Sequence, residues 1–316
     1  MKEGLDVKGV IEFLSAMTEK TGYPVPAPSG FASRWSEGLD LPRDGSERLL
    51  FTGALYQLVP YIEGTVDLLR AIEGSGAAGW AALRVARVLS TGFDLSSLVR
   101  PDPELLGWSN RVLRSIAGLL RALGVEFDYV PELSDMYSGV LLRDYGLMDA
   151  FRRHAEGVVN AIASAGYEEV IVVDPHTLDA VTNGYREALG RGLRAVSYLE
   201  LVRPTSRVAL RPAVHDSCVY ARRLGMVELP RKLLREAGVE VVEPPRSGAW
   251  TYCCGGPLEA LMPSLSQAVA QTRAKELRGA SEAAITMCPI CYINLRRASR
   301  GLGLRLLDIA EVLSGG

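Results

Sequence analysis

Residues 170–181 read VIVVDPHTLDAV, and residues 284–295 read AITMCPICYINL. Each stretch begins with an apolar run and reaches a proline directly after an aspartate in the first stretch and a cysteine in the second. A short apolar run that is bounded in this way predicts a fully buried strand ending in a turn. The two stretches therefore predict an internal repeat, with one strand–turn unit in each half of the chain.

The two halves correspond at further positions. MYSG (136–139) precedes a helical segment of the first half much as YCCG (252–255) does in the second. Where the second half has a cysteine, the first half has another residue: Ala54 matches Cys218, Tyr137 matches Cys253, Ser138 matches Cys254, Asp174 matches Cys288, and Thr177 matches Cys291. The first copy thus keeps the skeleton of the second without its sulfur. It also carries an insertion at about residues 70–108.

Apolar runs alternate with amphipathic segments along both halves. This alternation predicts an α/β fold with small parallel sheets that are covered on both faces. We expect two Rossmann-like units related by a pseudo-twofold axis, at residues 48–204 and 205–316, preceded by an N-terminal extension at 1–47. The expected strands are 48–53, 125–130, 170–175, 208–215, 239–243 and 283–287, and the expected helices are 61–72, 77–89, 105–123, 149–165, 230–237 and 263–277.

Composition narrows the function classes. The 316 residues are 48% hydrophobic and 23% charged, with a formal net charge of -2. There is no basic excess that would indicate nucleic-acid binding. No stretch has the roughly 18 unbroken apolar residues that a membrane span needs, and the first residues lack a secretory apolar core. We therefore expect a cytoplasmic protein, in a complex that is either soluble or attached to a membrane.

All five cysteines lie between Cys218 and Cys291, in the pattern C-x34-CC-x33-C-x2-C. An odd number packed into one third of the chain is a poor disulfide framework and suits a metal site. Each group falls where an expected strand gives way to a turn. Because such ends line one edge of a parallel sheet, the thiols should converge there. Gly255 and Gly256 would let the backbone pass close to a bulky cofactor.

The number of cysteines bears on the kind of metal site. Structural zinc and cubane iron–sulfur clusters each take four protein ligands, so a fifth thiolate is left to bridge metals or to stay free. Three further interpretations remain beside an iron–sulfur cluster. They are a zinc site, cysteines simply buried in the core, and a metal-free thiol oxidoreductase that acts through Cys288 and Cys291.

Three segments together resemble a known family. VHDSC (214–218), the run from Gly225 to Gly256 that ends in YCCGG, and MCPICY (287–292) resemble the CCG cysteine-rich domain. That domain occurs in the CCG-containing subunit of heterodisulfide reductase and in iron–sulfur subunits of enzymes that oxidise glycolate, lactate and glycerol 3-phosphate. The resemblance is strong over about residues 205–297 and weak over about 20–200.

The resemblance implies a noncubane [4Fe–4S] cluster held by all five cysteines, one of them bridging, although some relatives hold zinc at this place. The implied ligands are Cys218, Cys253, Cys254, Cys288 and Cys291. It further implies an oxidoreductase subunit that is not active alone and that partners a ferredoxin-type iron–sulfur subunit and a flavoprotein. The chain departs from the heterodisulfide reductase pattern because its first copy has no cysteine, so chemistry that needs two facing clusters is not expected. It also has no C-x2-C-x2-C-x3-C ferredoxin run, so electrons must pass to or from another subunit.

Residues outside the cysteines supply the remaining candidates. The catalytic candidates are His215 on the strand before Cys218, His176 in the first copy, and Tyr137 near it. Trp250 and Tyr252 flank the CCG, and we expect them either to shield the metal from water or simply to pack. The insertion is apolar and forms either an extra helical layer or a docking face for a partner. Its large apolar residues are Trp80, Leu83, Val88, Phe93, Leu98 and Trp108.

Overall fold

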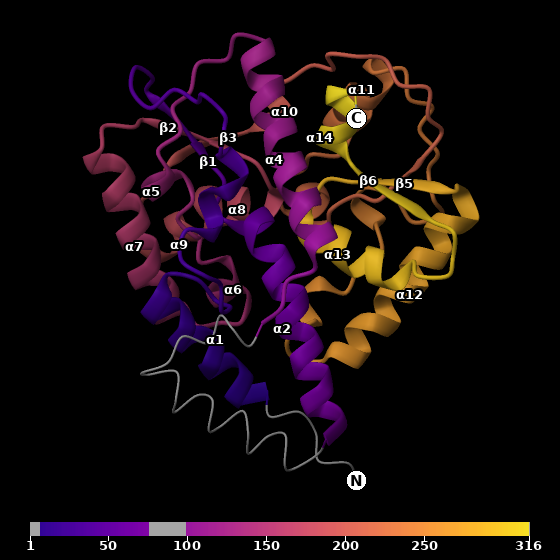
Figure 1. The fold of residues 1–316 in the computed structure, drawn as a ribbon, viewed down its shortest axis with the longest axis horizontal. Coiled ribbons are helices and arrows are strands. Elements are labelled where there is room, and N and C mark those ends of the chain that lie inside the picture. The colour runs from indigo at the N-terminus through magenta and orange to yellow at the C-terminus, as the bar shows by residue number, and fades with distance from the viewer. Residues whose placement is uncertain (1–6, 76–98, 316) are drawn as a thin grey trace.

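The computed structural model describes residues 7–75 and 99–315, and it contains two separate three-stranded parallel sheets (Figure 1). The first sheet has the order β1-β2-β3 and the second the order β4-β5-β6. The predicted α/β class is confirmed. The strands are β1 (Arg48–Phe51), β2 (Glu169–Val172), β3 (Arg194–Ser197), β4 (Ala213–Val214), β5 (Ala283–Thr286) and β6 (Arg305–Asp308).

Helices and short helical turns surround both sheets (Figure 1). Those of the first half are α1 (Val7–Thr21), η1 (Phe31–Ser36), α2 (Leu55–Ser75), α4 (Pro103–Ala122), α5 (Pro131–Ser134), α6 (Val140–Asp144), α7 (Met148–Ser164), α8 (Pro175–Asp179), η3 (Ala180–Gly184), α9 (Tyr185–Leu189) and α10 (Tyr198–Leu201). Those of the second half are η4 (Val219–Arg223), α11 (Glu228–Glu236), η5 (Gly248–Trp250), η6 (Gly256–Leu258), α12 (Pro263–Ala280), α13 (Pro289–Ala298) and α14 (Ile309–Ser314).

The two sheets have the same connectivity. In each, the middle strand follows the first strand after a long crossover and lies parallel to both neighbours. A single parallel bridge extends each sheet beyond its first strand, at Asp128 beside β1 and at Val242 beside β4. The predicted strands 125–130 and 239–243 are therefore reduced to single bridges. The strand expected at 208–215 is reduced to β4, which is only two residues long, because Pro212 has no N–H to donate to a neighbouring strand.

The middle strands end as the repeat predicts. Asp174 follows β2 as the N-cap of α8, and Cys288 follows β5 as the N-cap of α13, each in extended conformation with a proline next. The Asp174 side chain accepts a hydrogen bond from Thr177 N–H at 2.9 Å, whereas Cys288 makes no side-chain cap bond. The same local backbone therefore carries a polar cap in one half and a thiol in the other.

Two tyrosine hydrogen bonds join the halves reciprocally. Tyr56 at the start of α2 donates its hydroxyl to Asp308 Oδ2 at 2.8 Å. Tyr220 in η4 lies 3.0 Å from Ser197 Oγ. Asp308 and Ser197 are both N-caps with a complete capping box, Asp308 of α14 and Ser197 of α10. Each half thus binds the helix start that follows the last strand of the other half.

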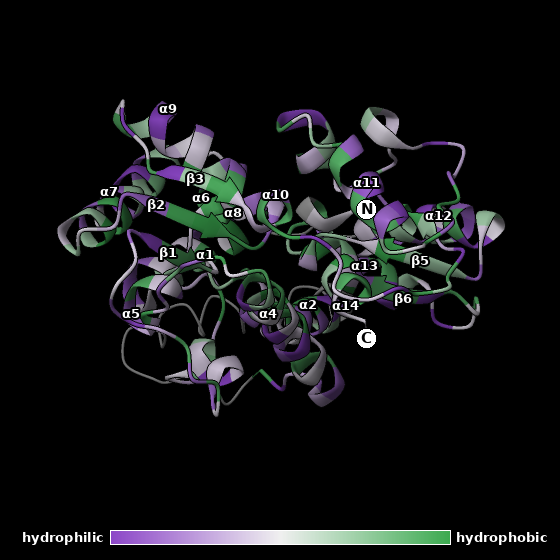
Figure 2. Ribbon diagram, turned by 90° about the horizontal axis from the view of Figure 1, so that it is seen from above, coloured by the Kyte–Doolittle hydropathy of each residue, from purple (hydrophilic) through white to green (hydrophobic). Residues whose placement is uncertain are grey.

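The seam between the halves is filled by helices. The long helices α2 and α4 lie between the two sheets (Figure 2) and pack against α13 and α14. Trp108 of α4 is buried and stacks on Tyr292 of α13 at 3.6 Å between ring centroids. For Trp108 the alternative of a buried helical layer is therefore correct. The other large apolar residues of the insertion, Trp80, Leu83, Val88, Phe93 and Leu98, lie outside the described residues.

We expect the two tyrosine bonds to contribute unequally to stability. A Tyr56→Phe substitution should lower the free energy of unfolding by about 2 kcal/mol at pH 8, because it removes a donor from a buried carboxylate. Tyr220→Phe should cost about 1 kcal/mol, because both of its partners are neutral hydroxyls. Urea unfolding followed by circular dichroism measures both, and an equal or reversed order of the two costs would contradict this account.

Candidate metal centre

Three of the five cysteines lie where a strand of the second sheet gives way to a helix. Cys218 directly precedes η4, a few residues after β4, and Cys288 and Cys291 lie at the start of α13 after β5. Cys253 and Cys254 lie in the loop between η5 and η6. Parallel strands bring their carboxyl ends to one edge of the sheet, so these three groups meet although the chain separates them.

The thiols form one continuous chain of contacts. Cys218 hydrogen-bonds Cys253, Cys253 contacts Cys254, Cys254 contacts Cys291, and Cys291 contacts Cys288. None of the five forms a disulfide. Cys254, Cys288 and Cys291 are buried, whereas Cys218 and Cys253 are partly exposed. The cluster therefore has a buried end in the core and an open end at the surface.

The chain of contacts makes the thiols unequal as acids. Hydrogen bonds from Cys218 and Cys254 lower the pKa of Cys253, aided by the N–H of Gly255 at 3.3 Å. Burial alone would raise the pKa of Cys288, but hydrogen bonds from Cys291 and from His176 hold it below its usual value. The pKa values of the three other thiols are raised, first by hydrogen bonds to Cys253 for Cys218 and Cys254, and first by the hydrogen bond to Cys254 for Cys291. Without added positive charge, neighbouring thiolates repel each other and five cannot ionise together.

Two glycines allow the CCG loop to pack closely on α12 and α13. Gly255 has φ +85, and a Cβ there would lie 2.5 Å from the carbonyl oxygen of Ser266. A Cβ on Gly256 would lie 2.3 Å from Ile290 Cγ2 and 3.4 Å from Cys254 Sγ. A side chain at Gly255 would therefore collide with α12, and one at Gly256 would push the CC pair away from the start of α13.

A buried ion-pair network holds the CCG loop in place. Arg231 of α11 binds Asp216 through two hydrogen bonds of 2.7 and 3.0 Å and also binds Glu243. Asp216 in turn accepts the N–H of Gly248 at 2.7 Å. Because Asp216 lies two residues before Cys218, this network ties the first cysteine to the loop that carries the next two.

His215 faces the thiols with a defined tautomer. Its Nδ1 accepts a hydrogen bond from Arg273 Nε at 3.0 Å, and Arg273 is fully buried in α12. An arginine donates only, so Nδ1 carries no proton. Burial and the arginine charge lower the pKa of His215 to about 3, so the ring is neutral and its proton sits on Nε2. That nitrogen is buried without a partner among the described residues.

The His215 ring also lies within reach of the sulfurs. One ring nitrogen and the sulfurs of Cys254 and Cys291 all lie within 4.8 Å of one another. A ring nitrogen that binds a metal carries no proton. If Nε2 lost its proton to bind a metal, the His215 ring would become an imidazolate beside Arg273. The ring is therefore built to donate a hydrogen bond toward the sulfurs. Arg273, like Asp216 and Arg231, was missed by the sequence analysis, since a buried arginine leaves no local signal.

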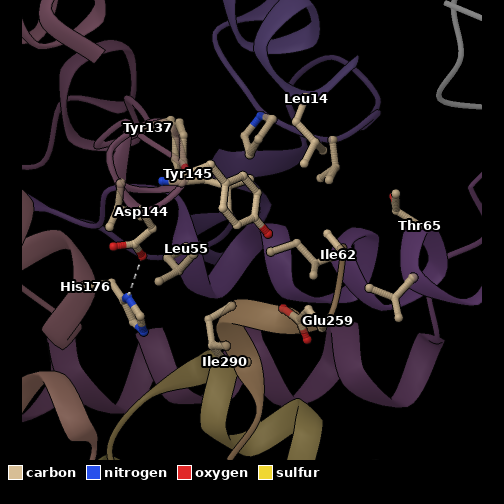
Figure 3. Close-up of a pocket in the computed structure, with 17 residues that line it drawn as sticks. Leu14, Leu55, Ile62, Thr65, Tyr137, Asp144, Tyr145, His176, Glu259 and Ile290 are labelled. Carbon is tan, nitrogen blue, oxygen red and sulfur yellow. Dashed lines mark hydrogen bonds and ion pairs between the residues drawn. The ribbon is translucent and has the colours of Figure 1, made fainter. Parts of the chain in front are cut away.

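His176 reaches the thiol cluster from the first half. It hydrogen-bonds Cys288, and its Nδ1 lies 3.9 Å from Asp144 Oδ2 (Figure 3). Burial would lower its pKa, but the charges of Cys288 and Asp144 and the hydrogen bond raise it to about 9. The sequence placed this residue in the first-copy site. The structure shows instead that it contacts a cysteine of the second copy across the seam.

The first-copy positions are buried and polar. Ser138 Oγ, Asp174 Oδ2 and Thr177 Oγ1 have no hydrogen-bond partner within the described part of the chain. Thr177 packs tightly on Gly53, where a Cβ would lie 2.3 Å from Thr177 Oγ1. Tyr137 is also buried, and its hydroxyl accepts the N–H of Leu141 at 2.9 Å. These positions have oxygen where the second copy has sulfur.

The expectation that Trp250 shields the metal is wrong, and so is the alternative that it packs in the protein. Trp250 is 86% exposed, because it ends the short turn η5, in which no residue is buried. Tyr252 packs differently. The Arg246 guanidinium lies over its ring at 3.8 Å from the centroid. The open end of the thiol cluster is thus bordered by an uncovered indole.

The residues present fit a metal group bound through sulfur. Thiolates are preferred by iron–sulfur clusters, zinc and copper(I), and a polynuclear cation would remove the repulsion among neighbouring thiolates. Gly256 brings its backbone close to the sulfurs that would hold this group, since a Cβ there would lie 3.4 Å from Cys254 Sγ. The orphaned Nε2–H of His215 offers it a hydrogen bond.

Comparisons with known proteins agree with this chemistry. Residues 212–296 match the family model of the CCG cysteine-rich domain. A probable membrane-anchored ferredoxin of Chromohalobacter salexigens is 27% identical over 65% of this chain and 33% of its own length. An EtfAB:quinone oxidoreductase of Syntrophomonas wolfei is 25% identical over 64% of this chain and 31% of its own length. One of the subunits of a fumarate reductase (CoM/CoB) from Methanothermobacter marburgensis is 31% identical over 34% of this chain and 22% of its own length.

The chain spans about a third or less of the length of these three relatives. Among solved structures, aspartate racemase from Picrophilus torridus covers 64% of this chain at 9% identity, with a TM-score of 0.30 that does not establish a shared fold. Within residues 7–75 and 99–315, no helix combines the length and apolar character needed to cross a bilayer. The matches confirm the predicted resemblance to the CCG cysteine-rich domain and support an iron–sulfur cluster as the cofactor.

Proposed function

We propose that this chain is the iron–sulfur redox subunit of a multi-subunit oxidoreductase, similar to the CCG-containing subunit of heterodisulfide reductase. It transfers electrons, or reduces a thiol or disulfide substrate, at a single cluster. The observation that carries this proposal is the unbroken chain of contacts from Cys218 to Cys288. Five converging thiols exceed what a structural zinc site or a cubane cluster takes from a protein.

The cluster that we propose is a noncubane [4Fe–4S] cluster. Its ligands are Cys218, Cys253, Cys254, Cys288 and Cys291. Adjacent cysteines 253 and 254 supply neighbouring sulfurs, and each contacts a second thiol, which suits a bridging position for one of them. When bound, such a cluster would supply one-electron chemistry.

The surrounding residues hold and tune this site. Arg273 fixes the His215 tautomer, so Nε2–H points a donor at the sulfurs from the buried side. Hydrogen bonds to the sulfurs of an iron–sulfur cluster favour the more negative, reduced form. His176 places a second hydrogen-bond donor at the sulfur of Cys288. We infer that both histidines position protons at the site, whereas Tyr137 serves the fold through Leu141.

We propose a single cluster because the first copy has no cysteine at the positions that match the ligands of the second. We propose that residues 48–204 and 205–316 are duplicated Rossmann-like units about a pseudo-twofold axis, with residues 1–47 as an extension. The equal strand order and the reciprocal tyrosine bonds support this. Because the first copy has oxygen and methyl groups in place of thiols, it cannot hold a second cluster of this kind.

A one-cluster subunit needs a partner to supply or accept electrons. We propose that a ferredoxin-type iron–sulfur subunit, itself served by a flavoprotein, docks over the open end of the thiol cluster. Cys218 and Cys253 are the two partly exposed cysteines, and Trp250 beside them is the most exposed of the large hydrophobic residues in the described chain. Tryptophan is enriched among residues that dominate protein–protein binding.

The first prediction concerns the metal. Protein purified without oxygen should hold about four irons per chain and show an electron paramagnetic resonance signal on oxidation or reduction. Cys253→Ser should remove the visible absorption, whereas Ser299→Ala, a change near the end of α13 away from the cysteines, should keep it. Stoichiometric zinc without iron, and no redox-dependent signal, would favour the alternative of a zinc-binding structural or assembly subunit.

The second prediction concerns His215. His215→Leu should keep the iron content but lower the midpoint potential of the cluster, because the reduced form loses a donor. A differential loss of about 1 kcal/mol corresponds to about 40 mV for one electron. His215→Gln, which can present an amide N–H, should recover part of the shift. A redox titration monitored by absorption measures both, and an unchanged potential in His215→Leu would remove this role.

The third prediction concerns the partner face. Trp250→Ala should weaken binding to the partner subunits from the native source by about tenfold, equivalent to about 1.4 kcal/mol, and leave iron content unchanged. The matched control is Met148→Ala, which removes an exposed apolar side chain from α7 in the other half. Binding to the purified partner complex is measured by calorimetry. Equal affinities for the Trp250→Ala variant and the unchanged chain would place the partner elsewhere.

A further inference from the structure

An apolar cavity lies at the seam of the two halves (Figure 3), and His176, which hydrogen-bonds Cys288, is among the residues that line it. Its volume is about 60 Å³. Aliphatic side chains of α1, α2 and α6 form most of its wall, and residues that follow the CCG close the side toward the second half. None of the functions assigned above uses this space.

The cavity shares its wall with the metal centre. His176 lines it and hydrogen-bonds Cys288 on its other side. Gly256 and Ile290 also line it, and a Cβ on Gly256 would lie 3.4 Å from Cys254 Sγ. A molecule in the cavity would therefore be separated from the sulfurs only by the His176 side chain or by the backbone of Gly256.

The charges around the cavity select against ions. No lysine or arginine occurs among its described lining residues, which include the carboxylates of Asp144 and Glu259. An anion would meet two carboxylates, and the one basic side chain of the described lining, His176, is already engaged by Asp144 and Cys288. Both carboxylates already have partners, since Asp144 lies near His176 and Arg223, and Glu259 accepts a hydrogen bond from Asn294 at 2.6 Å. A cation would lose its hydration among aliphatic side chains without gaining a free counter-ion.

The volume limits the size of the occupant. An apolar cavity of about 150 Å³ stays dry and takes benzene or xenon. A cavity of about 60 Å³ is too small for an aromatic ring and matches xenon or a chain of about three or four non-hydrogen atoms. Tyr145 and Glu259 add polar groups at the side away from His176 (Figure 3).

We propose that this cavity binds a short, uncharged alkyl thiol, with its alkyl chain among the side chains of α2 and α6 and its sulfur toward His176 and Gly256. The choice of a sulfur compound rests on the proposed function at the thiolate site, whereas the size and the lack of charge rest on the cavity alone. Thiols that bear a carboxylate or sulfonate are rejected. The cavity thereby sets the substrate class that reaches the centre from its buried side.

The test uses the anaerobic full-length holoprotein and two kinds of probe. Xenon, followed by 129Xe nuclear magnetic resonance, reports the cavity without any sulfur chemistry. Propane-1-thiol and 3-mercaptopropanoate, followed by electron paramagnetic resonance of the cluster, report the ligand class. We expect saturable xenon binding, a saturable spectral change with propane-1-thiol, and at least tenfold weaker binding of 3-mercaptopropanoate.

Variants tie both signals to the cavity. Val66→Phe fills the space from α2 and should abolish xenon binding and the propane-1-thiol effect with iron retained; Ile62→Phe replaces it if Val66→Phe loses iron. Leu68→Phe adds the same bulk on the exposed face of the same helix and should change neither signal. Glu259→Gln removes a carboxylate without changing the size of the side chain, so it should reduce the difference in affinity between propane-1-thiol and 3-mercaptopropanoate.

Three results would overturn the proposal. They are absence of xenon binding, retention of both signals in the filled variants, and equal binding of the charged and uncharged thiols. Protein that binds xenon at the cavity but holds no iron would instead refute the proposed function and, with it, the choice of a thiol as ligand. The failure of one proposal is therefore distinguishable from the failure of the other.

Discussion

Five thiols that meet at one edge of a parallel sheet are the constraint on which the second half depends. Neighbouring thiolates repel, so the protein alone distributes protons along the chain from Cys218 to Cys288. Much of the nearby structure serves this arrangement. Glycines remove side chains that would collide, Arg231 and Asp216 fix the CCG loop, and Arg273 keeps His215 neutral. A sulfur-bound metal group supplies the positive charge that this arrangement lacks.

The two halves share a backbone arrangement but differ in the side chains that follow their strands. Both have three parallel strands in equivalent order, and a tyrosine of each binds the helix start after the last strand of the other. At the positions that match the cysteines, the first half has alanine, hydroxyls and a carboxylate. It nevertheless contributes to the centre, because His176 crosses the seam to Cys288. The seam also holds the apolar cavity, so the cysteine-free half takes part in the site as a wall and as a source of hydrogen bonds.

Much of the fold was predictable where the signal is local. The apolar runs at β1, β2 and β5, the helix start at Asp102 and Pro103, and the equivalence of Asp174 with Cys288 all appear in the structure. Other expectations about the strands and about Trp250 were wrong or incomplete. Pro212 shortens β4, and β3 was missed because RAVS is brief and its outer residue is polar. Trp250 was expected to cover the metal or to pack, yet the turn that carries it points outward.

The sequence by itself determined the number and spacing of the cysteines, the strand–turn units that carry them, and hence their convergence. These follow from periodicity and from the geometry of parallel sheets, which depend on short stretches of chain. Only the tertiary structure decided that Arg273 sets the proton on His215, that His176 contacts Cys288 in the other half, and that a small, mostly apolar cavity adjoins the sulfurs. Those contacts join residues up to about a hundred positions apart, and their geometry depends on how whole helices pack across the seam.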